Sequence, residues 1–494
     1  MTDLVTTDSI ARDALAVLQP GFEGTTAPEW LLRRLDEGLG SVALFSRNIE
    51  SPEQLAKLTA QLREVRPDVL VAADEEGGDV TRLEARGGSS FPGNLALGAV
   101  DDAELTRSVA AELGRRLAAC GVNFNWAPSA DVNSDPDNPV IGVRSFGAEA
   151  WRVARHTAAY IEGLQSAGVA ACTKHFPGHG DTAVDSHHAL PRVDVPLATL
   201  RTRELMPFRA AIAVGTKAVM SAHLLVPAID PDLPGTLSRA VLTGLLREEL
   251  GYDGLIVTDG IDMGAIADTY GIERGTVLAL AAGADAICVG GGPSDEGTVV
   301  ALRDAIVRAV RVGDLPEQRL AEAAARVREV AEWTATAAGP QRAPDFEVGL
   351  TAARRALRVT RSEGYVPLTS PPYVAAFTPV ANIAVGDVTP WGVAAELERL
   401  FPGTVTGAFR EEDALSANVL RLAGDRRIVA VVRDVHRHPW MAAALGALIA
   451  ARPDTVVVEM GVPQALPSGA LHIATHGAAR VCGQAAAEVI AGQE

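Results

Sequence analysis

Short runs of apolar residues that end in glycine or polar residues recur through the first part of the chain. Eight runs are present, near residues 14 (ALAVLQPG), 41 (SVALFSR), 68 (DVLVAADEEGG), 121 (GVNFNWAPSADV), 168 (AGVAACTKHFPG), 217 (KAVMSAH), 254 (GLIVTDG) and 284 (ADAICVGGG). Their hydrophobicity is nearly continuous, which is typical of parallel strands buried on both faces. Segments with helical periodicity lie between them, such as SPEQLAKLTAQLREV and AELTRSVAAELGRRLAAC. The pattern predicts an α/β fold that begins with a (β/α)8 TIM-like barrel.

The pattern breaks and restarts beyond residue 335. A helical segment, LPEQRLAEAAARVREVAEWTATAA, is followed by GPQRAPDFE, whose glycine and prolines predict a linker at 336–348. Strand-like and helix-like segments then alternate again: YVAAFTPVANIAVGD, WGVAAELERLF, RRIVAVVRDV, MAAALGALIAAR and DTVVVEMG. We therefore expect a catalytic barrel at 1–335 and a smaller C-terminal α/β sandwich domain at 349–494.

Composition and charge narrow the classes of protein that fit. The 494 residues are 48% hydrophobic and 21% charged, which is ordinary for a globular protein, and the formal net charge is −18. Nucleic acids and anionic membranes bind basic surfaces, so neither is an expected partner, although a small anionic ligand is not excluded. The N-terminus has no basic start followed by an apolar stretch, and no run approaches ~18 apolar residues. A cytoplasmic location is the expectation.

Four of the ten histidines fall within KHFPGHGDTAVDSHHALP, residues 174–191, at positions 175, 179, 187 and 188. A metal site is one interpretation. Glycine and proline around the first two histidines forbid a helical HxxxH pair, however, and the chain contains no HExxH. The four cysteines are far apart and form no CxxC pair, so no thiolate zinc site or disulfide framework is indicated. We therefore expect no metal ion and no other cofactor.

The same stretch fits an acid/base role better. Asp185 precedes His187 by two residues, so on an extended loop both side chains point the same way and the carboxylate can orient the imidazole. Such a pair raises the pKa of the imidazole and suits proton donation near neutral pH. A surface Asp–His pair with no substrate nearby is the plain alternative.

Reactive side chains follow most of the predicted strands. They are Asp74, Asp131, Lys174, His175, His223 and Asp259. Barrel active sites lie at the carboxyl ends of the strands, although strand ends face solvent in any α/β fold. Asp259, which leaves the core beside Gly260, is a candidate nucleophile or metal ligand, and Asp262 is a candidate helix cap. The acids Asp74 to Glu76 suit a divalent cation or two adjacent sugar hydroxyls.

Taken together, these residues resemble glycoside hydrolase family 3, and in particular its NagZ-type β-N-acetylglucosaminidases, some of which carry an additional C-terminal α/β domain. The stretch KHFPGHGDTAVDSHHALP is similar to the signature of that subfamily. Support comes from DEEGG…R at 74–82, NFNWAPSADVN at 123–133, IGVRSFG at 141–147 and TDGIDMGAI at 258–266. These motifs occur in the order of the family and cover roughly residues 15 to 330.

The resemblance implies an exo-acting, retaining enzyme that works through a covalent glycosyl-enzyme. Asp259 matches the nucleophile of the family, His187 matches its acid/base, and Asp185 matches the partner of that histidine. Residues at positions that hold the sugar are Asp74, Arg82, Arg144, Lys174 and His175. The implied partner is therefore a small glycoside that ends in β-linked N-acetylglucosamine.

An imidazole at the acid/base position leaves other activities open. Retaining glycosidases usually use two carboxylates about 5 Å apart, and here an imidazole replaces one of them. Less negative charge on the acceptor side would let inorganic phosphate compete with water and yield a sugar 1-phosphate. A phosphorylase and a β-glucosidase of the same family are thus alternatives. A metal-dependent barrel hydrolase and a catalytically inactive sugar-binding protein are alternatives from other classes.

Three positions depart from the family pattern and put the sugar preference in doubt. Asp79 stands where relatives often carry a basic residue, Val143 where an acidic or polar residue is common, and Gly260 where bulkier residues are usual. In the second domain, RDVHRHPW offers His436 and His438 either for an active-site role or as part of a solvated loop.

Overall fold

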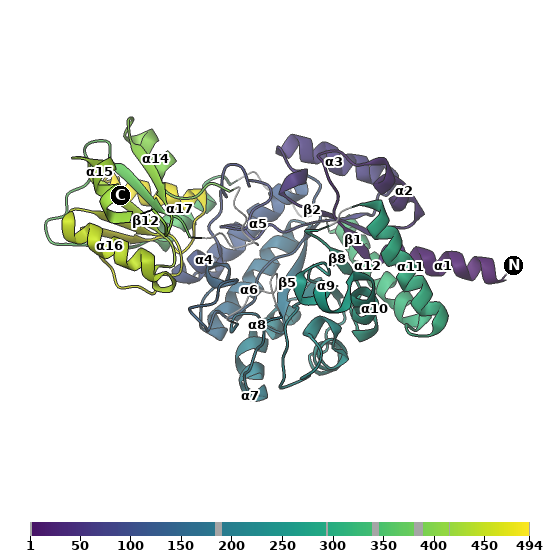
Figure 1. Ribbon diagram of the computed structural model, residues 1–494. Helices are drawn as coiled ribbons and strands as arrows, with labels where there is room; N and C mark the ends of the chain where they lie inside the picture. The colour runs from purple at the N-terminus through teal and green to yellow at the C-terminus, as the bar shows by residue number, and fades with distance from the viewer. Residues whose placement is uncertain are drawn as a thin grey trace. The chain divides into compact units, whose positions relative to one another are not determined.

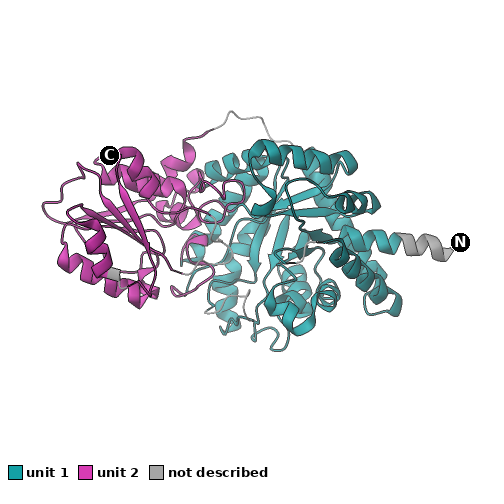
Figure 2. Ribbon diagram, turned by 45° about the horizontal axis from the view of Figure 1, so that its top comes forward, with its two compact units in different colours: residues 1–75, 106–134, 148–344 teal, residues 76–105, 135–147, 345–494 magenta. Residues whose placement is uncertain are grey.

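The structure, a computed structural model, describes residues 2–182, 190–292, 295–337, 345–379, 389–413 and 415–493. These residues divide into two compact units, which Figure 2 shows in different colours. The first unit comprises residues 1–75, 106–134 and 148–344, and the second comprises 76–105, 135–147 and 345–494. Residues 338–344 of the predicted linker lie outside the described part, and the predicted limits at 335 and 349 stay predictions.

Within the described part of the first unit, eight parallel strands form a TIM-like barrel (Figure 1). They are β1 (Leu18–Pro20), β2 (Ser41–Leu44), β3 (Leu70–Ala73), β4 (Phe124–Asn125), β5 (Ala170–Phe176), β6 (Ala218–Ser221), β7 (Leu255–Thr258) and β8 (Ile287–Val289). Strands β2 to β7 pair in chain order as one sheet, and β1 pairs with β8. A parallel bridge between Val257 and Ala286 connects β7 to the residue before β8. All eight predicted strands are confirmed.

Helices surround these strands (Figure 1). They are α1 (Thr2–Ala16), α2 (Glu29–Glu37), α3 (Pro52–Val65), α5 (Ala103–Ala119), α6 (Ala150–Ser166), α7 (Leu197–Thr199), α8 (Leu205–Ala213), α9 (Gly264–Tyr270), α10 (Ile272–Ala282), α11 (Glu296–Val312) and α12 (Glu317–Thr336), with shorter or wider turns η1 (Ser46–Asn48), η3 (Leu200–Glu204), η4 (Gly235–Leu237) and η5 (Ala240–Glu249). The predicted helix at SPEQLAKLTAQLREV is α3, where the Ser51 side chain accepts the Gln54 N–H at 3.2 Å and proline takes the first position. No helix of the described residues is both long and apolar enough to cross a membrane.

The first apolar run is split between two elements, which the sequence pattern did not predict. Residues 14–16 end helix α1, and only Leu18 to Pro20 form strand β1. The whole segment from Ala14 to Leu18 is buried, because the end of the helix and the start of the strand both pack against the barrel. A short apolar run cannot distinguish a buried helix end from a buried strand by periodicity alone.

The second unit contains a six-stranded sheet between two helical layers. Its described elements are α4 (Asn94–Val100), η2 (Gly142–Arg144), α13 (Val348–Ala356), β9 (Arg358–Arg361), β10 (Tyr373–Phe377), α14 (Ala394–Leu400), β11 (Val405–Phe409), α15 (Leu415–Ala423), β12 (Ile428–Val432), η6 (Val435–Arg437), α16 (Pro439–Ala451), β13 (Val456–Glu459), β14 (Leu471–Ala474) and α17 (Arg480–Ile490). The strand order is β11-β10-β12-β13-β14-β9, with only β9 antiparallel.

Alternate residues of these strands feed two separate cores. Val429 and Val431 of β12 pack with residues of α13, α14 and α17, whereas Ile428, Ala430 and Val432 pack with residues of α15 and α16. Burial on both faces explains why RRIVAVVRDV reads as one continuous apolar run. The predicted C-terminal α/β domain is confirmed.

Close backbone contacts join the three chain segments of the second unit. A Cβ atom on Gly98 would lie 1.9 Å from the Phe146 carbonyl oxygen, and one on Gly349 would lie 2.0 Å from that of Ser90. Arg480 also donates to the Ser90 hydroxyl at 2.6 Å. Residues 76–105 and 135–147 are therefore built into the C-terminal domain, although they come from the early part of the chain.

A buried carboxylate holds α12 against the amino ends of the barrel strands. Asp285, which is fully buried before β8, is bonded to Arg247, to Arg319 and, at 3.2 Å, to Arg326. It also accepts the Ile256 N–H at 2.9 Å. Three guanidinium groups thus share one buried carboxylate, and Arg319 has a second partner in Glu322 at 3.3 Å.

We expect Asp285→Asn to lower the free energy of unfolding by about 3–5 kcal/mol, because three half-buried guanidinium groups lose the fully buried carboxylate that they share. Urea unfolding at neutral pH measures the change. The control is Asp304→Asn, since Asp304 pairs with Arg303 at the surface with 51% of its side chain exposed; its effect should stay within about 1 kcal/mol. Equal effects of the two substitutions would contradict the prediction.

Candidate active site

Three charged side chains continue the inward-facing columns of the barrel strands. Successive strand residues point to opposite faces, so every second residue points toward the barrel interior. The interior cluster contains Leu70 and Ala72 of β3, Ala170 and Cys172 of β5, and Leu255 and Val257 of β7. The next residues in these three columns are Asp74, Lys174 and Asp259. The strand-end positions predicted from the sequence therefore lie on the inner side of the barrel mouth.

The three charged groups all influence one buried thiol, Cys172. Burial raises the pKa of Cys172, and the charges of Lys174, Asp259 and Asp74 all act on it. Cys172 is the inward-facing residue directly before Lys174 in its column, so the thiol lies just inside the charged layer. The structure thus brings together three of the predicted site residues.

Lys174 and Asp74 form a tight ion pair. The lysine Nζ lies 2.5 Å from Asp74 Oδ1, and 3% of the lysine side chain and 16% of the aspartate side chain are exposed. A buried ammonium needs such a partner because desolvation of an unpaired charge is costly. The pair also offers a donor and an acceptor side by side, an arrangement that can bind one sugar hydroxyl from both sides.

His175 is held by a carboxylate for which the sequence suggested no role. Asp131 is fully buried and accepts hydrogen bonds from His175 Nδ1 at 2.6 Å, from its backbone N–H at 3.2 Å and from the Ser129 hydroxyl at 2.9 Å. Burial opposes ionisation of Asp131, but the charge and hydrogen bonds of His175 outweigh it and lower the pKa of the carboxyl. The imidazole is thus oriented with Nδ1–H toward Asp131.

His179, which the sequence left without a role, supports the loop that follows β5. Its backbone N–H donates to Asp131 at 2.7 Å, and its Nδ1 lies 2.8 Å from the Thr182 hydroxyl. Burial, followed by the charge of His175, lowers the pKa of His179 to about 4. The ring is therefore neutral at neutral pH and acts in local structure. The predicted pair Asp185 and His187 lies outside the described residues.

Asp259 is half-buried directly after β7, and the loop that carries it is bonded on both sides. Its Oδ1 accepts the Gly260 N–H at 2.8 Å, and its own N–H donates to the Ser221 carbonyl at 3.1 Å. Asp262 accepts the N–H groups of Gly290 at 3.0 Å and Gly292 at 2.6 Å. The sequence suggested that Asp262 caps a helix, and this prediction is wrong. Asp262 instead bonds the loop after β7 to the loop after β8.

The other predicted sugar-binding residues belong to the second unit. Arg144 is buried at the end of η2, where its guanidinium pairs with Glu76 at 2.6 and 3.0 Å. Arg82 is half-buried in the segment before α4. Glu76 is thus the counter-ion of Arg144. Among the described residues, no group of three or more histidine, cysteine, aspartate or glutamate side chains could hold a metal ion.

The partners of Asp79 explain why an acidic residue occupies this position. Its carboxylate is paired with Arg433 after β12 and accepts the Ala478 N–H at 2.7 Å. Val143 is buried. His436 donates from Nε2 to the Pro136 carbonyl at 2.9 Å, and the His438 carbonyl accepts the Met441 N–H at 2.9 Å at the start of α16. Asp79 and His436 thus connect separate segments of the second unit, whereas His438 begins helix α16.

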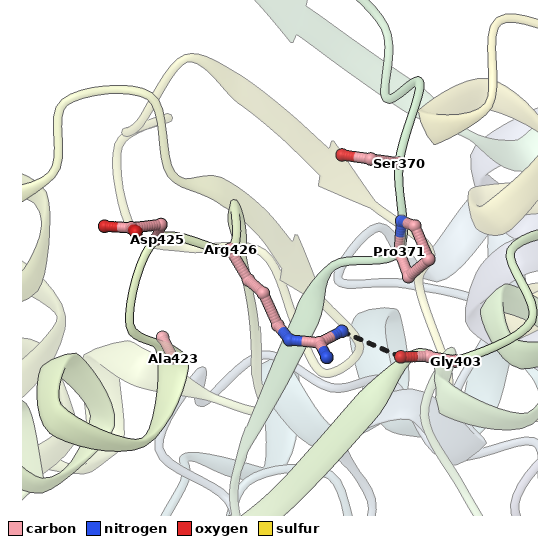
Figure 3. A pocket seen from close by; sticks show the side chains of 6 residues that line it. All are labelled: Ser370, Pro371, Gly403, Ala423, Asp425 and Arg426. Carbon is pink, nitrogen blue, oxygen red and sulfur yellow. Dashed lines mark hydrogen bonds between the residues drawn. The ribbon is translucent and has the colours of Figure 1, made fainter.

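A hollow of ≈ 600 Å³ lies in the second unit (Figure 3). It is lined by Ser370, Pro371, Gly403, Ala423, Asp425 and Arg426. Arg426 donates to the Gly403 carbonyl at 2.8 Å, the contact drawn in Figure 3. These residues precede β10, β11 and β12, so the hollow is at the amino ends of the strands. Ligand sites of α/β sheets lie at the carboxyl ends, and we assign this hollow no function.

A buried glutamate that the sequence did not reveal lies beneath the loop after β5. Glu204 ends η3, and a Cβ atom on Gly178 would lie 2.9 Å from the Glu204 Cβ. Arg203 contacts Glu204 Oε1 and Asp181 Oδ2, each at 2.5 Å. Burial raises the pKa of Glu204 to about 7 despite the pairing with Arg203. Nothing in its sequence context, LRTRELMPF, distinguishes Glu204 from a surface residue.

A barrel with carboxylates at its mouth is compatible with glycoside hydrolysis, one of many reactions that this fold supports. Residues 24–330 match the profile described as "Glycosyl hydrolase family 3 N terminal domain", and the chain belongs to this family. Beta-hexosaminidase A of Pseudoalteromonas piscicida is 38% identical over 52% of this chain and 46% of its own length. Beta-hexosaminidase of Chromobacterium violaceum is 35% identical over 70% of this chain and 95% of its own.

A solved structure resembles nearly the whole chain. It is a family 3 β-N-acetylglucosaminidase from Paenibacillus sp. str. FPU-7, with a TM-score of 0.87 and 37% sequence identity. The match covers 98% of this chain and 96% of that one. That solved structure therefore shares the α/β architecture of this chain, including the part beyond residue 345.

The raised pKa of Glu204 predicts a pH-dependent stability. The folded protein keeps this proton up to about pH 7, whereas the unfolded chain loses it near pH 4.5, so the free energy of unfolding falls as pH rises through that window. Glu204→Gln removes this titration, and the variant should gain about 3 kcal/mol relative to the wild type across the window. Urea unfolding at several pH values measures the difference.

The exposed Glu248 on η5 provides the matched control. Glu248→Gln removes one carboxylate from the surface and controls for the change in net charge. If the difference between Glu204→Gln and the wild type did not change with pH, the assignment of a protonated, buried Glu204 would be wrong.

Proposed function

We propose that this protein is an exo-acting, retaining β-N-acetylglucosaminidase that hydrolyses terminal β-linked N-acetylglucosamine from small glycosides. The observation that carries the proposal is the convergence of Asp259 with the Lys174–Asp74 pair at the barrel mouth. The sugar class is supported by relatives named beta-hexosaminidase and by the solved β-N-acetylglucosaminidase. The cytoplasmic location stays a prediction of the sequence.

Asp259 is the nucleophile in this proposal. Its Oδ1 accepts the Gly260 N–H, and we assign Oδ2 to attack at the anomeric carbon, which gives a covalent glycosyl-enzyme and expels the leaving group. The family resemblance assigns proton transfer to His187, with Asp185 as its partner. The same imidazole then removes a proton from water, which attacks the anomeric carbon and restores the Asp259 carboxylate.

The sugar is held by the groups around the nucleophile. Lys174 and Asp74 bind a ring hydroxyl as donor and acceptor, and His175, oriented by Asp131, donates or accepts a second hydrogen bond. Arg82 and Arg144 remain proposed sugar-binding residues from the resemblance. Because the pairs are assembled and buried before substrate arrives, little reorganisation is needed on binding, which favours catalysis.

Turnover of aryl glycosides tests the proposal. We expect the N-acetyl-β-glucosaminide to be cleaved with a kcat/KM at least about tenfold above that of the β-glucoside, a modest discrimination for one substituent. Added phosphate should leave free N-acetylglucosamine as the product. A sugar 1-phosphate would favour the phosphorylase instead, and faster cleavage of the glucoside would favour a β-glucosidase.

Asp259→Ala tests the nucleophile separately. Its kcat should fall by about 10³-fold or more, because the covalent step is lost. Azide should restore cleavage and give the α-glycosyl azide, since the small anion enters the face that the carboxylate occupied. Undiminished activity of the variant would rule out Asp259, and an inactive wild type would favour the sugar-binding protein.

A further inference from the structure

His223 is a fully buried histidine that contacts the loop after β7, which carries Asp259. It follows β6 by two residues, and its Nε2 lies 2.8 Å from the Gly260 carbonyl oxygen. A carbonyl oxygen only accepts hydrogen bonds, so Nε2 carries the proton of this contact. The histidine therefore donates to the residue that directly follows Asp259.

The imidazole is fixed from its other side. His223 Nδ1 lies 2.8 Å from the Thr236 hydroxyl, which is itself 2.9 Å from the Ser221 hydroxyl and donates to the Ala222 carbonyl at 3.1 Å. His223, Thr236 and Ser221 are all 0% exposed. Rotation of the ring would leave buried polar atoms unpaired, which is costly, so the ring has one position.

Gly260 connects this histidine to the catalytic carboxylate. Its N–H donates to Asp259 Oδ1 at 2.8 Å, and its C=O accepts from His223. Both backbone groups of one residue thus lie between the imidazole and the carboxylate. Glycine has the greatest backbone freedom of any residue, so this position needs an external contact to hold one conformation.

The contact from His223 complements those on the far side of the loop. There Ile261 donates to the Cys288 carbonyl at 2.9 Å, and Asp262 accepts from Gly290 and Gly292. On the β6 side, the Asp259 N–H donates to the Ser221 carbonyl. His223 provides the side-chain contact on this side, so its loss would let Gly260 turn and change the aim of the carboxylate.

We propose that His223, held by Thr236, is a positioning residue for Asp259 that sets the direction of the nucleophilic oxygen through Gly260. The inference rests on the proposed role of Asp259 as nucleophile. His223 touches neither the sugar nor the reacting atoms in this role. It acts on formation and breakdown of the glycosyl-enzyme and leaves the sugar-binding pair Lys174–Asp74 in place.

Three variants separate the hydrogen bond from the bulk of the ring. His223→Leu removes the donor to Gly260, and we expect kcat to fall about 100-fold with KM within about threefold, as for a misplacement of about 1 Å. His223→Gln keeps an N–H near the position of Nε2 and should recover to within about tenfold of the wild type. Thr236→Val removes the contact to Nδ1 at nearly constant volume and should lie between the two.

The covalent step is measured directly with a 5-fluoro-N-acetylglucosaminyl fluoride. Attack by Asp259 forms the carboxylate–C1 bond and expels fluoride, and intact-mass spectrometry follows the adduct while peptide mapping locates it. The trapping rate should fall in parallel with kcat. A residue that served only general stability would not produce this parallel or the recovery in His223→Gln.

His156 supplies a matched control. It is also fully buried, and its Nδ1 lies 2.8 Å from the Thr106 hydroxyl, but it is located on α6 and this partner is on α5. His156→Leu should lower the melting temperature while the trapping rate of the folded enzyme stays within about twofold of the wild type.

The outcomes are separable. Wild-type trapping rates in folded His223→Leu, or equal slowing in His156→Leu, would overturn the inference. If His223→Leu does not fold, the other two variants decide, because wild-type rates in both would overturn it. A wild type labelled at a residue other than Asp259, or not labelled, refutes the proposed nucleophile and with it the premise for His223.

Discussion

The alternation of side chains along parallel strands is the constraint on which the rest of this structure depends. Once β3, β5 and β7 pair in the barrel, every second residue faces inward, and the side chains two places beyond Ala72, Cys172 and Val257 must meet at the mouth. The charged residues that follow the apolar, inward-facing residues of these strands therefore determine which groups meet at the barrel mouth. Small side chains below them, such as Ala72 and Ala170, leave the room that the charged layer needs.

Neighbouring carboxylates stabilise the charged groups of that layer and hold them in position. Asp131 orients His175, Asp74 compensates Lys174, and Asp262 fastens the loop of Asp259. Asp131 and Asp74 come from a strand or loop other than the one that carries the functional side chain, whereas Asp262 bonds the loop of Asp259 to the loop after β8. The barrel therefore provides position through shape and orientation through buried hydrogen bonds, and the second contribution is the more sensitive to single substitutions.

The sequence predicted what local pattern encodes. The eight barrel strands and β10, β12 and β13 were evident because burial on both faces makes them continuously apolar. Strand β9 was missed because RVTR is an exposed edge with no apolar run, and β11 because VTGAF is largely exposed. Asp74, Lys174 and Asp259 were found from their strand-end positions. The roles of Asp131 and His223 were not, because their partners lie tens of residues away. The role of Glu204 was not, because the loop at Gly178 that packs on it lies tens of residues earlier in the chain.

The three-segment origin of the second unit also determines how the polypeptide can be made and divided. As the chain leaves the ribosome, residues 76–105 and 135–147 emerge long before residue 345, the start of the long segment that completes their unit. Until then Asp79 has neither Arg433 nor the Ala478 N–H, and Ser90 lacks Arg480. Residues 76–105 and 135–147 therefore obtain their packing partners only when the C-terminal segment has been translated. A stop codon near residue 337 would release a barrel with two unfinished loops rather than a smaller, self-sufficient enzyme.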